Sequence, residues 1–86
     1  MEPDYVFQCP GCDQEHGIWT SAPNRLKAKW KFDGDMNKPT IRPSLHIKIG
    51  KKTICHSIIT KGMIQYLSDC MHNMAGKTIE LPEISE

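Results

Sequence analysis

The sequence has few aromatic residues and lacks a long apolar run. Of its 86 residues, 7% are aromatic and 38% are hydrophobic. Apolar runs are short: the one at Ile58 and Ile59 stops at Thr60, whereas a membrane-spanning helix needs about 20 apolar residues. A chain this small can build only a modest core, and domains of this size often need a metal ion or a disulfide to fold.

The chain also lacks an excess of either charge and a secretory signal. Eleven Lys and Arg oppose ten Asp and Glu, a net charge of +1, which argues against a strong nonspecific DNA binder. The first residues, Met-Glu-Pro-Asp, have no apolar core of the kind that directs export. We therefore expect a cytoplasmic protein whose cysteines meet a reducing environment, where metal ligation is favoured over disulfides.

Short β-prone segments separated by turns account for most of the chain. They predict one mainly β, antiparallel domain over residues 1–82, with an acidic tail at 83–86 that is expected to fray. Pro39 and Pro43 bracket an extended piece that is not expected to be a central strand. Ser68 or Asp69 can cap one short helical turn that ends at Gly76. We expect strands at 5–8, 17–20, 29–33, 45–49, 53–59, 63–67 and 77–81.

The strongest local motif is Cys9-Pro10-Gly11-Cys12. Two thiolates two residues apart, on a turn that contains Pro and Gly, are typical of a zinc knuckle. The alternative is a redox dithiol, which normally lies at the start of a helix in a βαβ unit. No βαβ pattern follows here, so the motif predicts half of a zinc-ribbon-like Zn²⁺ site.

A structural zinc site needs four ligands, so residues elsewhere must complete the shell. His16, Cys55, His56, Cys70 and His72 compete for these places. Cys55 and His56 are adjacent in a predicted strand and should point to opposite faces, which leaves the choice between them open. The predicted metal ligands are Cys9 and Cys12, completed from among Cys55, His56 and His72.

A run of alternating cations surrounds one tryptophan. In an extended strand, Arg25, Lys27, Lys29 and Lys31 would share one face, beside Trp30. Basic residues next to an aromatic ring can contact nucleic acid through phosphate pairing and base stacking. A solvated strand face is the alternative, so this candidate binding surface awaits a test of salt-dependent binding.

Several motifs in order resemble a known family. They include the Cys9–Cys12 knuckle, Cys55-His56-Ser57, Asp69-Cys70-Met71-His72, and the segment from Ala75 to Leu81. The chain resembles small, uncharacterised phage and prophage proteins, a domain of unknown function sometimes mislabelled as ammonia monooxygenase. The resemblance implies a phage-encoded accessory protein in the host cytoplasm and implies no particular activity.

The sequence leaves two functions from different classes open, and it favours a binding protein over an enzyme. The first is a zinc-stabilised binding protein whose partner is a host or phage macromolecule, for example in blocking a host defence. The second is a zinc-dependent hydrolase with three protein ligands and a water, in which Asp69, His56 or His72 serves as general base. Two thiolates donate much charge to a metal and favour a structural ion over a catalytic one. A place in a larger assembly, through pairing of short strands, is a third interpretation.

Overall fold

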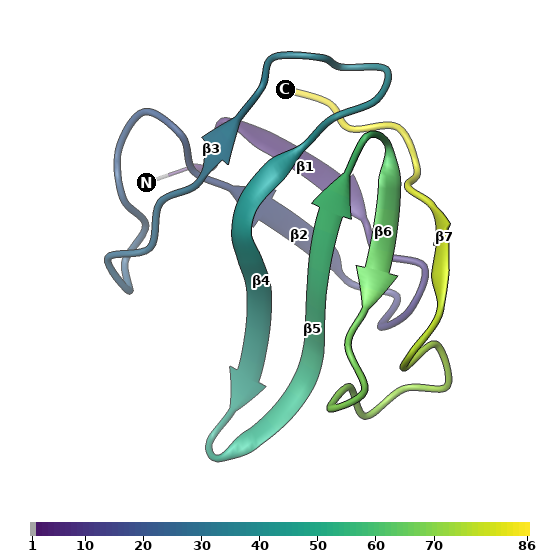
Figure 1. Ribbon diagram of the computed structural model, residues 1–86. Coiled ribbons are helices and arrows are strands. Elements are labelled where there is room, and N and C mark those ends of the chain that lie inside the picture. Colours follow the sequence, from purple (N-terminus) through teal and green to yellow (C-terminus); the bar gives the residue numbers. More distant parts are fainter. Residues whose placement is uncertain (1) are drawn as a thin grey trace.

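The computed structural model describes residues 2–86, and within that range the regular structure consists of strands alone (Figure 1). The mainly β, antiparallel prediction is therefore confirmed. The strands are β1 (Tyr5–Gln8), β2 (Glu15–Ile18), β3 (Lys31–Phe32), β4 (Ile41–Ile49), β5 (Lys52–Thr60), β6 (Met63–Tyr66) and β7 (Thr78–Glu80).

The strands form two sheets. β1 and β2 make a hairpin of their own, and β3 to β7 form a five-stranded antiparallel sheet in chain order. In Figure 1 the hairpin lies behind the larger sheet and crosses it. Apolar side chains from both sheets form one core, whose buried members are Phe7, Cys9, Ile18, Ile41, Leu45, Cys55, Ile59, Ile64, Tyr66 and Ile84.

Strand β5 has two chemically different faces. Cys55, Ser57 and Ile59 are buried, whereas the alternating residues His56 and Ile58 are only partly buried. This is the two-residue period of a strand that lies over a core on one side and meets solvent on the other. The adjacent Cys55 and His56 thus belong to different surroundings, as their spacing predicts.

Two irregularities set the pairing of β4 with β5. A register shift between Ile47 and Lys48 brings His46 directly opposite His56. A second shift lies between Ile41 and Leu45 and contains Pro43. Ile41 pairs with both Phe32 of β3 and Ile59 of β5, so the expectation that the piece between Pro39 and Pro43 is not a central strand is wrong there. Pro43 itself lies within the register shift, where a strand can lack a backbone donor.

The segment after β6 is not the helical turn that was expected. It forms successive tight turns, with bonds from Ala75 N–H to the His72 carbonyl and from Lys77 N–H to the Met74 carbonyl. The chain is held instead by the neighbouring strand, since Met71 N–H donates to the Ile54 carbonyl. Contacts with β5 therefore override the local capping signal.

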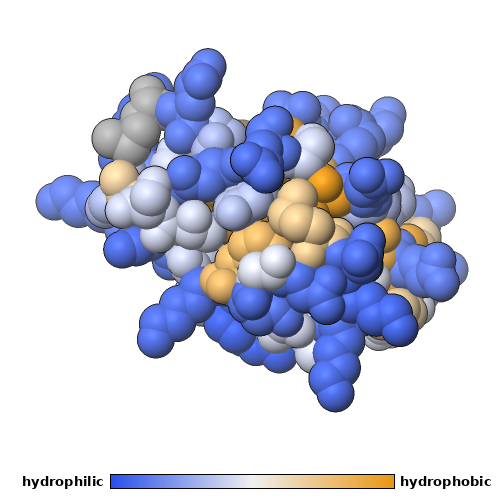
Figure 2. Space-filling view, turned by 90° about the horizontal axis from the view of Figure 1, so that it is seen from above, coloured by the Kyte–Doolittle hydropathy of each residue, from blue (hydrophilic) through white to orange (hydrophobic). Residues whose placement is uncertain are grey.

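The last residues pack against the domain. Ile84 is 3% exposed, and Val6 and Ser85 exchange two backbone hydrogen bonds. The expected fraying of the acidic tail is not seen, because Ile84 contributes to the core. In the view of Figure 2 the surface is mostly hydrophilic, with an apolar patch near its centre. No helix in residues 2–86 is long and apolar enough to cross a membrane.

Candidate functional site

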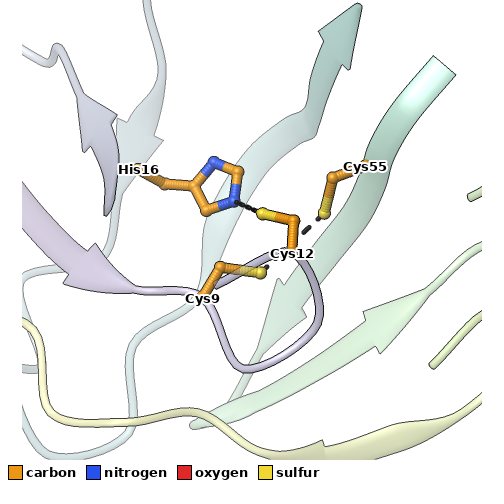
Figure 3. A group of neighbouring side chains, drawn as sticks. All are labelled: Cys9, Cys12, His16 and Cys55. Atoms are coloured by element: carbon orange, nitrogen blue, oxygen red, sulfur yellow. Dashed lines mark hydrogen bonds between the residues drawn. The ribbon is translucent and has the colours of Figure 1, made fainter. Parts of the chain in front are cut away.

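The first site is a cluster of three thiols and one imidazole between the two sheets (Figure 3). Cys9 and Cys12 come from the turn between β1 and β2, His16 from β2 and Cys55 from β5. One ligand atom from each lies within 4.8 Å of all the others. This Cys₃His cluster could hold a metal ion.

The spacing of the cluster matches a tetrahedral centre. A metal–sulfur bond of about 2.3 Å and tetrahedral angles put two sulfurs roughly 3.8 Å apart. The Sγ atoms of Cys9 and Cys55 are 3.9 Å apart. The Nε2 atom of His16 points at Cys12 Sγ at 3.2 Å, while its ring stacks on Phe7.

Hydrogen bonds around Cys9 favour its thiolate form. Gly11 N–H donates to the Tyr66 hydroxyl at 3.0 Å, which leaves the hydroxyl proton free to point at Cys9 Sγ, 3.1 Å away. Bonding from Cys55, and also from Tyr66, lowers the pKa of Cys9. The same pairing raises the pKa of Cys55, and burial raises the pKa of Tyr66. A bound cation would release the remaining thiol protons, because metal ligation deprotonates thiols.

His72 lies beside the cluster rather than inside it. Its Nδ1 atom accepts from Met74 N–H, so Nε2 carries the proton and faces Cys55 Sγ at 3.4 Å. The knuckle fits closely against this ring: a Cβ on Gly11 would lie 2.5 Å from a His72 carbon. Only glycine allows that approach. The structure therefore brings His16 into the ligand group, where the sequence had pointed to His56 and His72.

The second site is a hydrogen-bonded row of Ser44, His56 and Asp69 on the opposite face of β5. Ser44 Oγ lies 3.0 Å from His56 Nε2. His56 Nδ1 lies 3.0 Å from Asp69 Oδ2 and 3.3 Å from Oδ1. Because the carboxylate accepts only, it holds the ring proton on Nδ1 and leaves Nε2 to accept from the serine hydroxyl.

The surroundings of His56 restrict the orientation of its ring. His46 stacks on it, with ring centroids 4.1 Å apart and planes within 12°. The side chain of His56 is 20% exposed, whereas that of Asp69 is 49% exposed. The hydrogen bond from His56 lowers the pKa of Asp69, so the carboxylate is charged when the row forms. A serine, an imidazole and a carboxylate bonded in this order are the arrangement by which a base can activate a nucleophile.

Cys70 fixes the distance between the last two members of this row. Its Sγ accepts from the His56 backbone N–H at 3.1 Å and lies 3.2 Å from the His56 carbonyl. The residue next to Asp69 is thereby attached to the strand that carries His56. Cys70 also lies near Cys55 and His72 in a second possible metal group, and His46, His56 and Asp69 form a third.

The cations around Trp30 do not share a strand face. The chain turns between Asn24 and Ala28, and Lys27 has a positive φ of 66°. Of the four cations only Lys31 lies in a strand, at the start of β3. Arg25, Lys27 and Lys29 are exposed on the preceding loop, and Trp30 is half-buried.

Sequence reasoning missed Ser44. It named His56 as a possible metal ligand and His56 or Asp69 as the general base of a zinc-dependent hydrolase. It did not connect them to a serine, because a lone serine carries no recognisable pattern. One signal was present: strands were expected at 45–49 and 53–59 with a turn at Gly50 and Lys51. An antiparallel hairpin about that turn brings Ser44 level with Ser57, but only the shift between Ile47 and Lys48 puts Ser44 on the same face as His56.

Comparison with known families gave one result. A family model described as "Bacterial ubiquitination-like system serine protease (BubE)" matches residues 2–67. The matched range includes Ser44 and His56 and ends shortly before Asp69. No curated protein and no solved structure match the chain.

This match overturns three expectations from the sequence. The resemblance to uncharacterised phage proteins is wrong, because the model that covers most of the chain is that of a serine protease family. The interpretation as a phage accessory binding protein is wrong for the same reason. So is its alternative, a zinc-dependent hydrolase, since the family description specifies a serine protease rather than a metal-dependent enzyme.

Proposed function

Because the chain belongs to the BubE family, described as serine proteases of a bacterial ubiquitination-like system, we propose that it is a serine protease with Ser44 as nucleophile. The observation that carries the proposal is the continuous row from Ser44 through His56 to Asp69, with 3.0 Å at each step. Because the family is described as a serine protease, we expect the substrate to be a polypeptide. A reducing compartment such as the cytoplasm suits four unpaired cysteines.

The proposed reaction is acyl transfer in two steps. Ser44 Oγ attacks the carbonyl carbon of the scissile bond while His56 Nε2 takes the hydroxyl proton. The imidazolium then gives this proton to the leaving nitrogen or oxygen, and an ester on Ser44 remains. A water molecule attacks that ester while His56 Nε2 accepts one of its protons, and the imidazolium returns this proton to Ser44 Oγ as the carboxylic acid product leaves. Asp69 stabilises the imidazolium and its orientation throughout.

We further propose that the metal of the Cys₃His cluster is Zn²⁺ and that its role is structural. Three thiolates and one imidazole form a closed four-ligand set that leaves no position for a substrate or water. The ligands join the β1–β2 hairpin to β5, so the ion would hold together two sheets that share a small core. His72 and Tyr66, each within hydrogen-bonding distance of a cluster sulfur, would stabilise the thiolates.

A fluorophosphonate reagent, which reacts with activated serines, tests the proposal. We expect intact-protein mass spectrometry to find one phosphonylated site, at Ser44, and the Ser44→Ala variant to remain unlabelled. Ser68→Ala removes an exposed serine from the neighbouring loop and serves as the matched control. His56→Ala should slow labelling by about 10³-fold or more, because the general base is lost.

Two results would contradict the proposal. One is labelling that survives Ser44→Ala at the wild-type rate. The other is an unlabelled wild-type protein that is shown by circular dichroism to be folded and by elemental analysis to contain its metal.

A further inference from the structure

One edge of β4 has no strand beside it over most of its length. β3 pairs with β4 only through Lys31–Arg42 and Phe32–Ile41, and within residues 2–86 no other strand lies on that side. From Pro43 to Ile47 this edge instead lines a groove of 550 Å³. Ser44 is itself one of the lining residues, so the groove reaches the proposed nucleophile.

The opposite wall of the groove is a tightly bonded loop that presents a leucine. Asn24 Oδ1 accepts from the N–H groups of Leu26 and Ala28, both at 2.9 Å. The backbone of Asn24 also exchanges bonds with Lys27 and Ala28. Despite this order, Leu26 is 84% exposed. A single exposed leucine is common on protein surfaces, but here the loop holds it at the groove in a defined position.

Two tryptophans connect this loop to the nucleophile. Trp30 N–H donates to the Trp19 carbonyl at 2.8 Å, and both side chains line the groove. The indole N–H of Trp30 donates to the backbone carbonyl of Ser44 at 3.3 Å. The apolar wall is therefore fixed relative to the residue that would attack the substrate.

We infer that this groove binds the substrate's polypeptide chain next to the scissile bond, in an extended conformation along the open edge of β4, with an aliphatic side chain against Leu26 and Trp19. The inference rests on the proposed function, since a chain whose carbonyl reaches Ser44 must continue along the groove. An extended segment can use the free backbone groups of a strand edge, and the apolar wall then selects its side chains.

The test uses two synthetic octapeptides that differ at one central position, leucine in one and serine in the other. Trp19 and Trp30 are the two tryptophans of the chain and both line the groove, so their fluorescence reports binding directly. In the Ser44→Ala variant we expect the leucine peptide to bind more tightly than the serine peptide by about fivefold or more. Leu26→Ser should abolish this preference.

Ile49→Ser is the matched control. Ile49 is an aliphatic residue at the end of β4 that is 69% exposed but does not line the groove. This variant should leave the preference unchanged. In wild-type protein the leucine peptide should also slow fluorophosphonate labelling of Ser44 more than the serine peptide does, whereas Ile49→Ser without peptide should label at the wild-type rate.

The outcomes separate the two ideas. Absence of labelling at Ser44 overturns the proposed function. If Ser44 is labelled normally, three results would overturn the inference alone: equal binding of the two peptides, no binding of either at millimolar concentration, or a preference that survives Leu26→Ser.

Discussion

The two faces of β5 carry two different kinds of site from adjacent residues. On one face Cys55 is fully buried and its Sγ lies 3.9 Å from that of Cys9, within a group drawn from two strands and one turn. On the other face His56 is 20% exposed and lies between Ser44 and Asp69. The buried face excludes solvent from a potential metal, and the open face leaves a nucleophile within reach of a polypeptide.

The contrast between the two faces of β5 indicates how a chain of 86 residues could support a reactive site without a large core. A metal held by the Cys₃His cluster would cross-link distant segments, which supplements the small core. The reactive row needs only short hydrogen bonds between neighbouring strands and a loop. One face is thus expected to determine whether the protein folds, and the other whether it reacts.

Removing the metal should produce the largest effect and should act on both faces. Cys9→Ser, or extraction with a strong chelator, is expected to lower the free energy of unfolding by about 4 kcal/mol or more, as for other losses of a structural metal. Labelling of Ser44 should be lost together with the fold. Denaturant titration and elemental analysis for zinc provide the measurements.

Ser44→Ala is the matching change on the open face. It should retain zinc and shift the free energy of unfolding by less than about 1 kcal/mol, because Ser44 is only half-buried. If the two variants lose stability equally, the division between the faces is wrong.

Asp69→Asn should have an intermediate effect confined to the open face. An amide at this position no longer specifies the ring tautomer, which lowers the rate of labelling at Ser44. Because Asp69 is 49% exposed and solvent screens its charge, we expect a loss of about 10- to 100-fold rather than the larger losses known for buried acids. Labelling kinetics measure the loss, and an unchanged zinc content and unfolding curve confine it to this face.

The smallest effect should come from Asp4, which lies away from both sites. Its carboxylate accepts from Thr20 N–H at 2.7 Å and from Ser21, and these bonds lower its pKa to about 2. Since the folded pKa lies below the unfolded value of about 3.9, the stabilisation is complete above that value and is lost as the pH falls toward 2.

The Asp4→Asn variant should therefore be slightly less stable than wild type at neutral pH and converge with it near pH 2. Urea titrations across this range measure the difference. A change in labelling rate or zinc content at neutral pH would show that Asp4 is not independent of the two faces.

Much of the fold and part of the sites could be predicted from the sequence. Strand alternation and turn residues located most strands, and the spacing of Cys9 and Cys12 indicated a metal-binding turn. The third and fourth members of the cluster could not be chosen, because they depend on how the β1–β2 hairpin packs on β5. Ser44 was missed because the shift between Ile47 and Lys48, which sets His46 opposite His56, has no local signature.

The loop after β6 touches both faces with residues three apart. Asp69 bonds His56, and His72 faces Cys55 and packs on Gly11. The number of residues between these contacts is therefore constrained at both ends, unlike in an ordinary surface loop, where insertions are tolerated. A single residue inserted between Asp69 and His72 would force one contact to break, so the length of this segment is as restricted as the identity of its side chains.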